Sequence, residues 1–187
     1  MEIYIKEYQK WLHSSLLSDD EKKELSEISN DEQEIKERFY SSLEFGTAGL
    51  RGKMRLGTNA MNRFTVSQAT QGLANLIIKE GRAKDGVVIS YDSRNNSELF
   101  AKVSASVLAA NGIKSYIFDE LRPTPELSFA LRELKCVAGI NITASHNPKE
   151  YNGYKVFWSD GAQVTSPVDK DIVAEVAKIT DPSMVKF

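Results

Sequence analysis

The chain has 187 residues, which is enough for one domain with a sizeable core, and its formal net charge of −2 gives it no overall basic character. This balance argues against nucleic acid as a partner, and no apolar run is long enough to predict a membrane-spanning segment. The one cysteine, Cys136, cannot form an internal disulfide, so a reducing, cytoplasmic location is expected.

Three short helices are predicted at the N-terminus. Apolar residues recur at helical spacing over residues 1–17. Ser18 and Glu21 have the spacing of a capping box and predict the start of a second helix. Asn30 and Gln33 predict the start of a third.

An acidic bias marks the same part of the chain. Through residue 44, acids (12) outnumber Lys and Arg (6), which predicts a solvated outer surface, with a partner site as the alternative. We therefore expect a helical extension over residues 1–44 and an α/β domain over residues 45–187.

Residues 46–63 have the opposite character, because this glycine-rich segment contains four cations and no acid. Glycine lets backbone amides approach a ligand closely, and cations attract anions, so phosphate is the expected ligand. The segment lacks the Gly-Lys-Ser/Thr ending of a Walker A loop and the G-x-G-x-x-G pattern of a dinucleotide-binding turn. Composition alone leaves a flexible surface loop as an equal alternative.

Strands and helices alternate over the rest of the chain. Thr65 with Gln68 predicts the start of a helix that ends at Gly81. Ser166-Pro167 predicts the last helix, with proline at its first position. Strands are expected at 87–91, 113–118, 136–142 and 155–158, with helices between them. This alternation predicts a layered α/β/α domain with a mostly parallel, mixed sheet, preceded by the N-terminal helices.

The segment Thr-Ala-Ser-His-Asn-Pro at 143–148 follows an apolar strand. Pro148 lacks a backbone donor and disfavours a helical Asn147, so the strand is expected to end in a turn there. Asn152-Gly153 predicts a second turn. The serine then lies just past the carboxyl end of a strand, where open α/β sheets place their ligands.

Ser145 can act as a nucleophile only if another group takes its proton. His146 is adjacent in sequence, and in an extended segment its side chain leaves the opposite face, which argues against a hydrolase-type Ser–His pair. A serine that carries a phosphoryl group needs cationic donors around it, and Lys155 is a candidate.

The segment 143–148, followed by Tyr-Asn-Gly-Tyr-Lys at 151–155, resembles the active-site loop of the α-D-phosphohexomutase superfamily. Residues 44–52 resemble the N-terminal motif of the same superfamily, with Ala48 and Leu50 in place of the Ser and Ile of many relatives. The flanking residues resemble the phosphoglucomutase/phosphopentomutase branch. The resemblance covers nearly the whole chain but only the first of four family domains, which implies a catalytic-domain fragment that is inactive alone.

The resemblance implies specific roles for the site residues. Ser145 would be the phosphoserine that gives a phosphoryl group to a sugar phosphate and takes one back. Arg51 would hold phosphate beside it, Lys155 would be the general acid/base, and His146 would orient or donate to the phosphoryl group or the substrate. Asn147 is expected to shape the loop and is a candidate for substrate or phosphate binding.

Two further expectations concern Arg94 and a metal. The family often has an Asp-x-Arg motif near its catalytic cleft, which makes Arg94 a candidate for substrate or phosphate binding, with a structural salt link as the alternative. The family's Mg²⁺ binds the serine phosphate oxygen, here on Ser145, and aspartates of an Asp-Gly-Asp-x-Asp-Arg motif. This chain has no such motif, so the remaining ligands are expected outside it.

The resemblance therefore implies domain I of a phosphoglucomutase that interconverts glucose 1-phosphate and glucose 6-phosphate. Its expected partners are the sugar phosphate and the C-terminal domains of the same polypeptide. The alternatives are a phosphopentomutase or phosphomannomutase of the same superfamily, a non-catalytic sugar-phosphate-binding module and a serine hydrolase.

Overall fold

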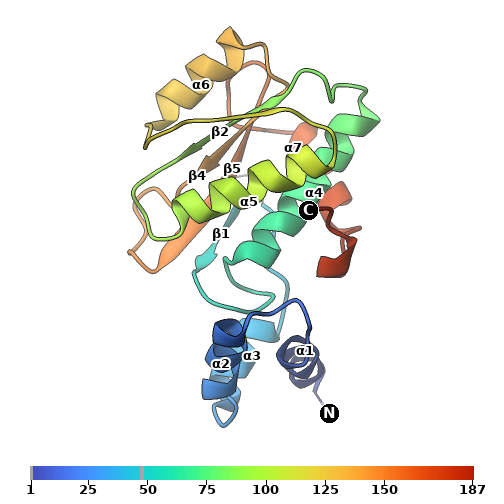
Figure 1. Cartoon of the computed structure of the whole chain (residues 1–187), viewed down its shortest axis with the longest axis vertical. Helices are drawn as coiled ribbons and strands as arrows, with labels where there is room; N and C mark the ends of the chain where they lie inside the picture. Colours follow the sequence, from blue (N-terminus) through green and yellow to red (C-terminus); the bar gives the residue numbers. More distant parts are fainter. Residues whose placement is uncertain (1, 47–48) are drawn as a thin grey trace.

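A five-stranded sheet flanked by helices forms the larger part of the computed structural model, and a group of helices lies at its N-terminal end (Figure 1). The structure describes residues 2–46 and 49–187, so Thr47 and Ala48 of the glycine-rich segment lie outside the described residues. The N-terminal helices are α1 (Ile3–Leu12), α2 (Asp19–Glu27) and α3 (Glu32–Phe39). The elements that follow are β1 (Leu50–Lys53), α4 (Arg63–Lys79), β2 (Val87–Tyr91), α5 (Ser97–Ala110), β3 (Ser115–Ile117), α6 (Thr124–Glu133), β4 (Ala138–Ile142), β5 (Tyr151–Trp158), α7 (Val168–Val176) and the short 3-10 helix η1 (Pro182–Met184).

The strand order in the sheet is β1-β5-β4-β2-β3. β2 pairs in parallel with both β3 and β4, whereas β5 pairs antiparallel with both β4 and β1. Within the described sheet, β5 therefore runs against the other strands, which share one direction. The predicted mixed, mostly parallel sheet is confirmed.

Helices cover the two faces of the sheet unequally. One face packs against α4 and α5, with α7 beside α4, and contributes Ile89, Ile140 and Tyr154 to the main core. The other face packs against α6 through a smaller cluster that includes Val88 and Phe157. Because side chains alternate along a strand, each strand supplies both clusters. The predicted α/β/α layering is confirmed, and α6 is the helix over the second face (Figure 1).

Several helix boundaries differ from the sequence-based prediction. Asp31 caps α3 through the backbone N–H of Glu34, one residue after the predicted Asn30. Asn62 caps α4, and Thr65 is its partner in the capping box instead of the cap itself. Both predictions failed because another polar residue with a suitable side chain stood nearby in the sequence.

One further helix start needs correction. Pro167 is the N-cap of α7 and not its first helical residue. Leu134, which follows α6, and Val173 on α7 are both exposed. Gly81 ends α4 as predicted, with a positive φ of 71° just after the C-cap.

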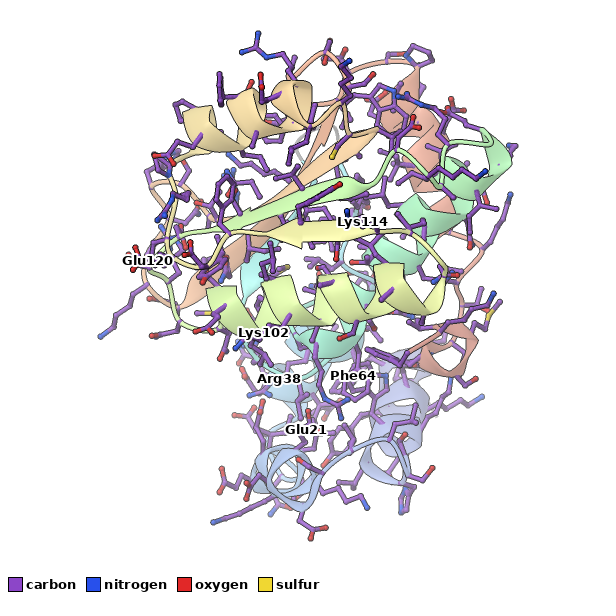
Figure 2. The ribbon with its side chains drawn as sticks, turned by 45° about the horizontal axis from the view of Figure 1, so that its top comes forward. Glu21, Arg38, Phe64, Lys102, Lys114 and Glu120 are labelled. Atoms are coloured by element: carbon purple, nitrogen blue, oxygen red, sulfur yellow. The ribbon has the colours of Figure 1, made fainter. Side chains whose placement is uncertain are left out.

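The N-terminal helices have a core of their own. Tyr8, Trp11 and Phe39 make edge-to-face aromatic contacts there, and Phe64 from α4 extends the same stack. Figure 2 shows Phe64 and Arg38 at the junction between these helices and the sheet-bearing part. The predicted extension is thus anchored to the α/β part by apolar packing.

Ion pairs reinforce that junction. Glu34 accepts hydrogen bonds from Arg38 Nε at 2.9 Å and Arg55 Nη1 at 2.8 Å. Glu24 accepts from Arg38 Nη1 at 2.6 Å, and Glu21 contacts Arg63 Nε at 2.7 Å. The prediction that the acidic excess is only a solvated surface is wrong for these carboxylates, because they neutralise cations of the 46–63 segment and of α3.

Candidate active site

Ser145 lies on the connection between β4 and β5. The preceding Thr143 and Ala144 are buried, whereas Ser145 is exposed, and its φ of +58° is one that few non-glycine residues adopt. Its N–H donates to Thr143 Oγ1 at 3.0 Å. The serine is therefore displayed just beyond the carboxyl end of β4, where the sequence predicts it.

The predicted turn at Asn152-Gly153 is wrong, because both residues lie buried inside β5. Asn152 donates its side-chain amide to Asn95 O at 3.0 Å and Ser97 Oγ at 2.9 Å. A Cβ on Gly153 would lie 2.6 Å from Thr143 O, so this glycine allows a close backbone approach.

Lys155 and Arg51 lie on neighbouring strands. Arg51 of β1 pairs with Gly153 of β5, and Lys155 is two residues further along β5. Paired residues, and residues two apart on a strand, share a face of the sheet. Tyr154 faces the core on the other side, 3.1 Å from the Thr70 hydroxyl. Both cations therefore lie on the face that α6 only partly covers.

The connection that carries Ser145 begins at the same place. The Thr143 N–H donates to Gly153 O at 3.0 Å, which continues the β4–β5 pairing up to the loop. The structure thus brings the Ser145 loop, Arg51 and Lys155 to one end of three adjacent strands. Their chemical roles remain predictions.

The electrostatics of this group are dominated by positive charge. Burial, together with the positive charge of Arg51, lowers the pKa of the Lys155 ammonium. Of the four cations in the 46–63 segment, Lys53, Arg55 and Arg63 form ion pairs with acids of α2 and α3. Arg51 has no such acidic partner among the residues that the structure describes. An anion at this end of the sheet would be attracted by two uncompensated cations.

Gly49 explains how β1 reaches β5 so closely. Its φ is +91°, and a Cβ at this position would lie 1.9 Å from Tyr154 O and 3.0 Å from Lys155 Cα. Only glycine tolerates both the conformation and the contact. The glycine-rich segment therefore packs at Gly49 against the backbone of Tyr154 and Lys155.

Arg94 makes hydrogen bonds to backbone carbonyls of the Ser145 loop. Its Nη1 donates to Pro148 O at 2.9 Å and Tyr151 O at 3.1 Å, and its Nη2 donates to Ser145 O and Asn147 O, both at 2.8 Å. The salt link expected as the alternative is present, because Arg94 Nε lies 3.4 Å from Asp92 Oδ2, whereas substrate or phosphate binding by Arg94 stays a prediction.

His146 and Asn147 differ in their surroundings. His146 is exposed on the loop. Asn147 is half-buried, and its Oδ1 is a buried acceptor with no hydrogen-bond partner among the described residues. A buried, unpaired acceptor is uncommon and fits a position beside a donor that binding would supply.

Sequence reasoning missed a polar row that crosses the same face of the sheet. Asn141 of β4 lies directly opposite Lys155 of β5 and Ser90 of β2. Its amide donates to Thr124 Oγ1 at 2.8 Å, and its Oδ1 accepts from Ser90 Oγ at 3.2 Å. The available signal was a buried asparagine inside an otherwise apolar strand, which predicts a hydrogen-bonded role.

Two clefts lie elsewhere. One of about 720 Å³ runs between the N-terminal helices, the 40–45 segment and α7, and a small one of about 40 Å³ lies beside the Lys10–Asp181 ion pair. Neither is lined by Ser145, Lys155 or Arg51. The candidate site is instead an exposed loop beside an uncovered part of the sheet.

Comparison with known proteins places the chain among the sugar-phosphate mutases. Residues 42–183 match the family model described as phosphoglucomutase/phosphomannomutase, alpha/beta/alpha domain I. A phosphopentomutase from Pongo abelii is 40% identical over 94% of this chain and 30% of its own length. A phosphoglucomutase from Staphylococcus epidermidis is 45% identical over 80% of this chain and 27% of its own length. The chain thus spans less than a third of the length of these curated relatives.

Solved structures share the fold. The open form of parafusin (phosphoglucomutase) from Paramecium superposes with a TM-score of 0.65 at 24% identity, over 79% of this chain and 26% of its own. No helix in the described part of the chain is both long and apolar enough to cross a lipid bilayer. Taken with the serine loop and the two cations beside it, the match over most of the sequence shows that the chain belongs to the phosphoglucomutase/phosphomannomutase family, as its α/β/α domain I.

Proposed function

We propose that this chain is the phosphoserine-bearing domain of a phosphoglucomutase, an intramolecular phosphotransferase that interconverts glucose 1-phosphate and glucose 6-phosphate. The observation that carries the proposal is the arrangement of three groups at one end of the sheet. Ser145 is exposed on its strand-end turn, and Arg51 and Lys155 project from the adjacent strands on one face.

The reaction follows from these groups. A phosphoryl group on Ser145 Oγ is transferred to a hydroxyl of the sugar phosphate, so the Oγ–P bond breaks and a new sugar O–P bond forms. The hydroxyl proton passes to Lys155 and then to the departing serine oxygen. A lowered pKa makes the unprotonated amine of Lys155 more accessible near neutral pH, as this proton transfer requires.

Arg51 stabilises charge that spreads over the phosphoryl oxygens during transfer. Phosphoryl transfer depends mostly on positioning and electrostatic stabilisation, and a guanidinium binds phosphate in a fixed geometry. His146, exposed beside the serine, orients the phosphoryl group or the substrate. Asn147, whose Oδ1 lacks a protein partner, shapes the loop and accepts a hydrogen bond from the bound ligand.

The proposed cofactor is Mg²⁺. The described residues contain no group of three His, Cys, Asp or Glu that could hold a metal. We propose that this chain contributes the phosphate oxygen on Ser145, a hard oxygen ligand of the kind that Mg²⁺ prefers. When bound, the ion would neutralise charge on the phosphoryl oxygens. The remaining ligands, and the residues that select the sugar, are proposed to come from downstream domains of the same polypeptide.

A phosphopentomutase is the second candidate, because the Pongo abelii relative with that name matches 94% of this chain. The discriminating measurement is the ratio of kcat/KM for glucose 1-phosphate and ribose 1-phosphate, made on a polypeptide that includes the downstream domains. A preference for the hexose supports phosphoglucomutase, and a preference for the pentose replaces it.

Replacing Ser145 tests the proposal against the non-catalytic and hydrolase alternatives. Ser145→Ala should abolish mutase turnover in that polypeptide while the unfolding midpoint stays unchanged, because the side chain is exposed. Retained turnover would refute the phosphoserine role. Labelling of Ser145 by an organophosphate probe would instead indicate a serine hydrolase.

A further inference from the structure

Arg94 directs both terminal nitrogens of its guanidinium at one segment of backbone. Its two terminal nitrogens donate to the carbonyls of Ser145, Asn147, Pro148 and Tyr151 at 2.8–3.1 Å. The remaining donor, Nε, lies 3.4 Å from Asp92 Oδ2. A guanidinium has five N–H donors, and here its four terminal N–H groups bind the four loop carbonyls while Asp92 forms an ion pair with the same side chain.

Asp92, the acidic partner of Arg94, is held in place by hydrogen bonds of its own. Asp92 Oδ1 accepts from the Arg94 backbone N–H at 3.0 Å and from Ser97 Oγ at 2.8 Å. Ser97 Oγ in turn accepts from the Asn152 amide at 2.9 Å, which ties the start of α5 to β5. The Arg94 side chain is only 14% exposed, so it points into this framework and away from solvent.

We propose that Arg94 is a positioning residue whose contacts with the 145–151 loop keep Ser145 in its left-handed conformation. That this conformation serves phosphoryl transfer rests on the proposed function. A serine with a φ of +58° is not held there by local preference. The contact of Nη2 with Ser145 O supplies a specific restraint on that residue.

The hydrogen bonds from Arg94 also fix the direction of backbone N–H groups in the loop. In a trans peptide the C=O and N–H groups point in opposite directions. Because the carbonyls of Ser145 and Pro148 point at Arg94, the N–H groups of His146 and Lys149 point away from it. Preorganised backbone N–H groups of this kind stabilise negative charge, so Arg94 acts on phosphate through the backbone.

The test measures amide hydrogen exchange of the 145–151 peptide in the 187-residue chain. Arg94→Ala should speed exchange there by about tenfold or more, and Arg94→Lys should do so less, because a lysine keeps the charge but cannot reach four carbonyls in a fixed fork. Exchange in β2 and β4 should stay unchanged. Arg82→Lys, which alters an arginine paired with Asp85 outside the site, is the matched control.

Chemical rescue separates positioning from general damage. Guanidinium at millimolar concentration should restore slow exchange in Arg94→Ala, and tetramethylammonium at the same concentration should not. If the loop exchanges alike in wild type and Arg94→Ala, or if protection is lost equally over the core and is not rescued, the proposal is overturned.

A double variant separates this role from direct phosphate binding. Positioning through carbonyls predicts that Arg94→Ala accelerates loop exchange equally with Ser145 and with Ser145→Ala. Direct binding of a serine phosphate predicts that the effect disappears in Ser145→Ala, which would overturn the proposal. Protein that interconverts sugar phosphates without ever carrying phosphate on Ser145 would instead refute the proposed function and, with it, the transfer step. The exchange measurements would still test whether Arg94 restrains the loop.

Discussion

Arg51 and Lys155 are cations on the same face of neighbouring antiparallel strands, and the charge of Arg51 acts with burial to lower the pKa of Lys155. Two like charges this close are unfavourable unless an anion lies near them. The arrangement is therefore costly for the free protein and useful for one that binds phosphate. This kind of local cost is common at functional sites.

Lys155→Met should make the chain more stable near neutral pH. The folded-state pKa of Lys155 lies below the usual 10.5, so the unfolded chain binds more protons between the two pKa values. The free energy of unfolding of the wild type should therefore rise with pH across that window. The advantage of Lys155→Met should shrink as the pH approaches 10.5.

Urea unfolding at about pH 7 and about pH 10 measures this difference. Lys102→Met, on the exposed face of α5 and paired with Glu98, is the control and should show no such gain near neutral pH. An advantage of Lys155→Met that is the same at both pH values would contradict the assignment of a lowered pKa.

Gly49→Ala should destabilise the chain by more than about 2 kcal/mol, because it combines backbone strain with a clash. The new Cβ would lie 1.9 Å from Tyr154 O at a φ of +91°. Gly46→Ala is a close control in the same segment, because a Cβ there meets nothing within 4 Å. Thermal unfolding of both variants makes the comparison, and equal destabilisation would show that the close approach of Gly49 to β5 is not as described.

Glu34→Gln should weaken the junction between the N-terminal helices and the α/β part. It removes the charge that Arg38 and Arg55 share, and both guanidinium groups are at most 14% exposed. Each arginine keeps one other carboxylate, Glu24 for Arg38 and Glu37 for Arg55, so the loss of the shared one should cost about 1–3 kcal/mol. Denaturant unfolding should show this loss, and Glu98→Gln on α5, in an exposed pair, should show no measurable change. Indistinguishable results for the two variants would mean that the junction does not depend on these ion pairs.

The sequence predicts the layered fold well because its signals are local and repeated. Apolar periodicity identifies the buried strands, and Gly81 identifies a helix end. The cap at Asn62 was missed because Thr65 also has the chemistry of a cap, and only the backbone conformation decides between them. The Asn152-Gly153 error has a related cause, since that pair suits a turn unless tertiary contacts satisfy the amide.

The candidate site, like the fold, could be predicted from local sequence patterns only in part. The motif around Ser145 predicts its position at a strand end, but the face shared by Arg51 and Lys155 depends on the register of β1 against β5. No local pattern specifies that register. The contacts of Arg94 with four carbonyls come from residues more than 50 positions away in sequence, so composition could suggest a cation there but not what it binds.

Phosphopeptide mapping would show whether Ser145 carries a phosphoryl group during the reaction. The protein, isolated from its own cells with phosphatase inhibitors present, would be digested and sequenced by mass spectrometry. We expect phosphate on Ser145 and its loss when a sugar phosphate acceptor is added. A peptide covering residues 143–149 that is never phosphorylated, from protein that still interconverts sugar phosphates, would contradict this expectation.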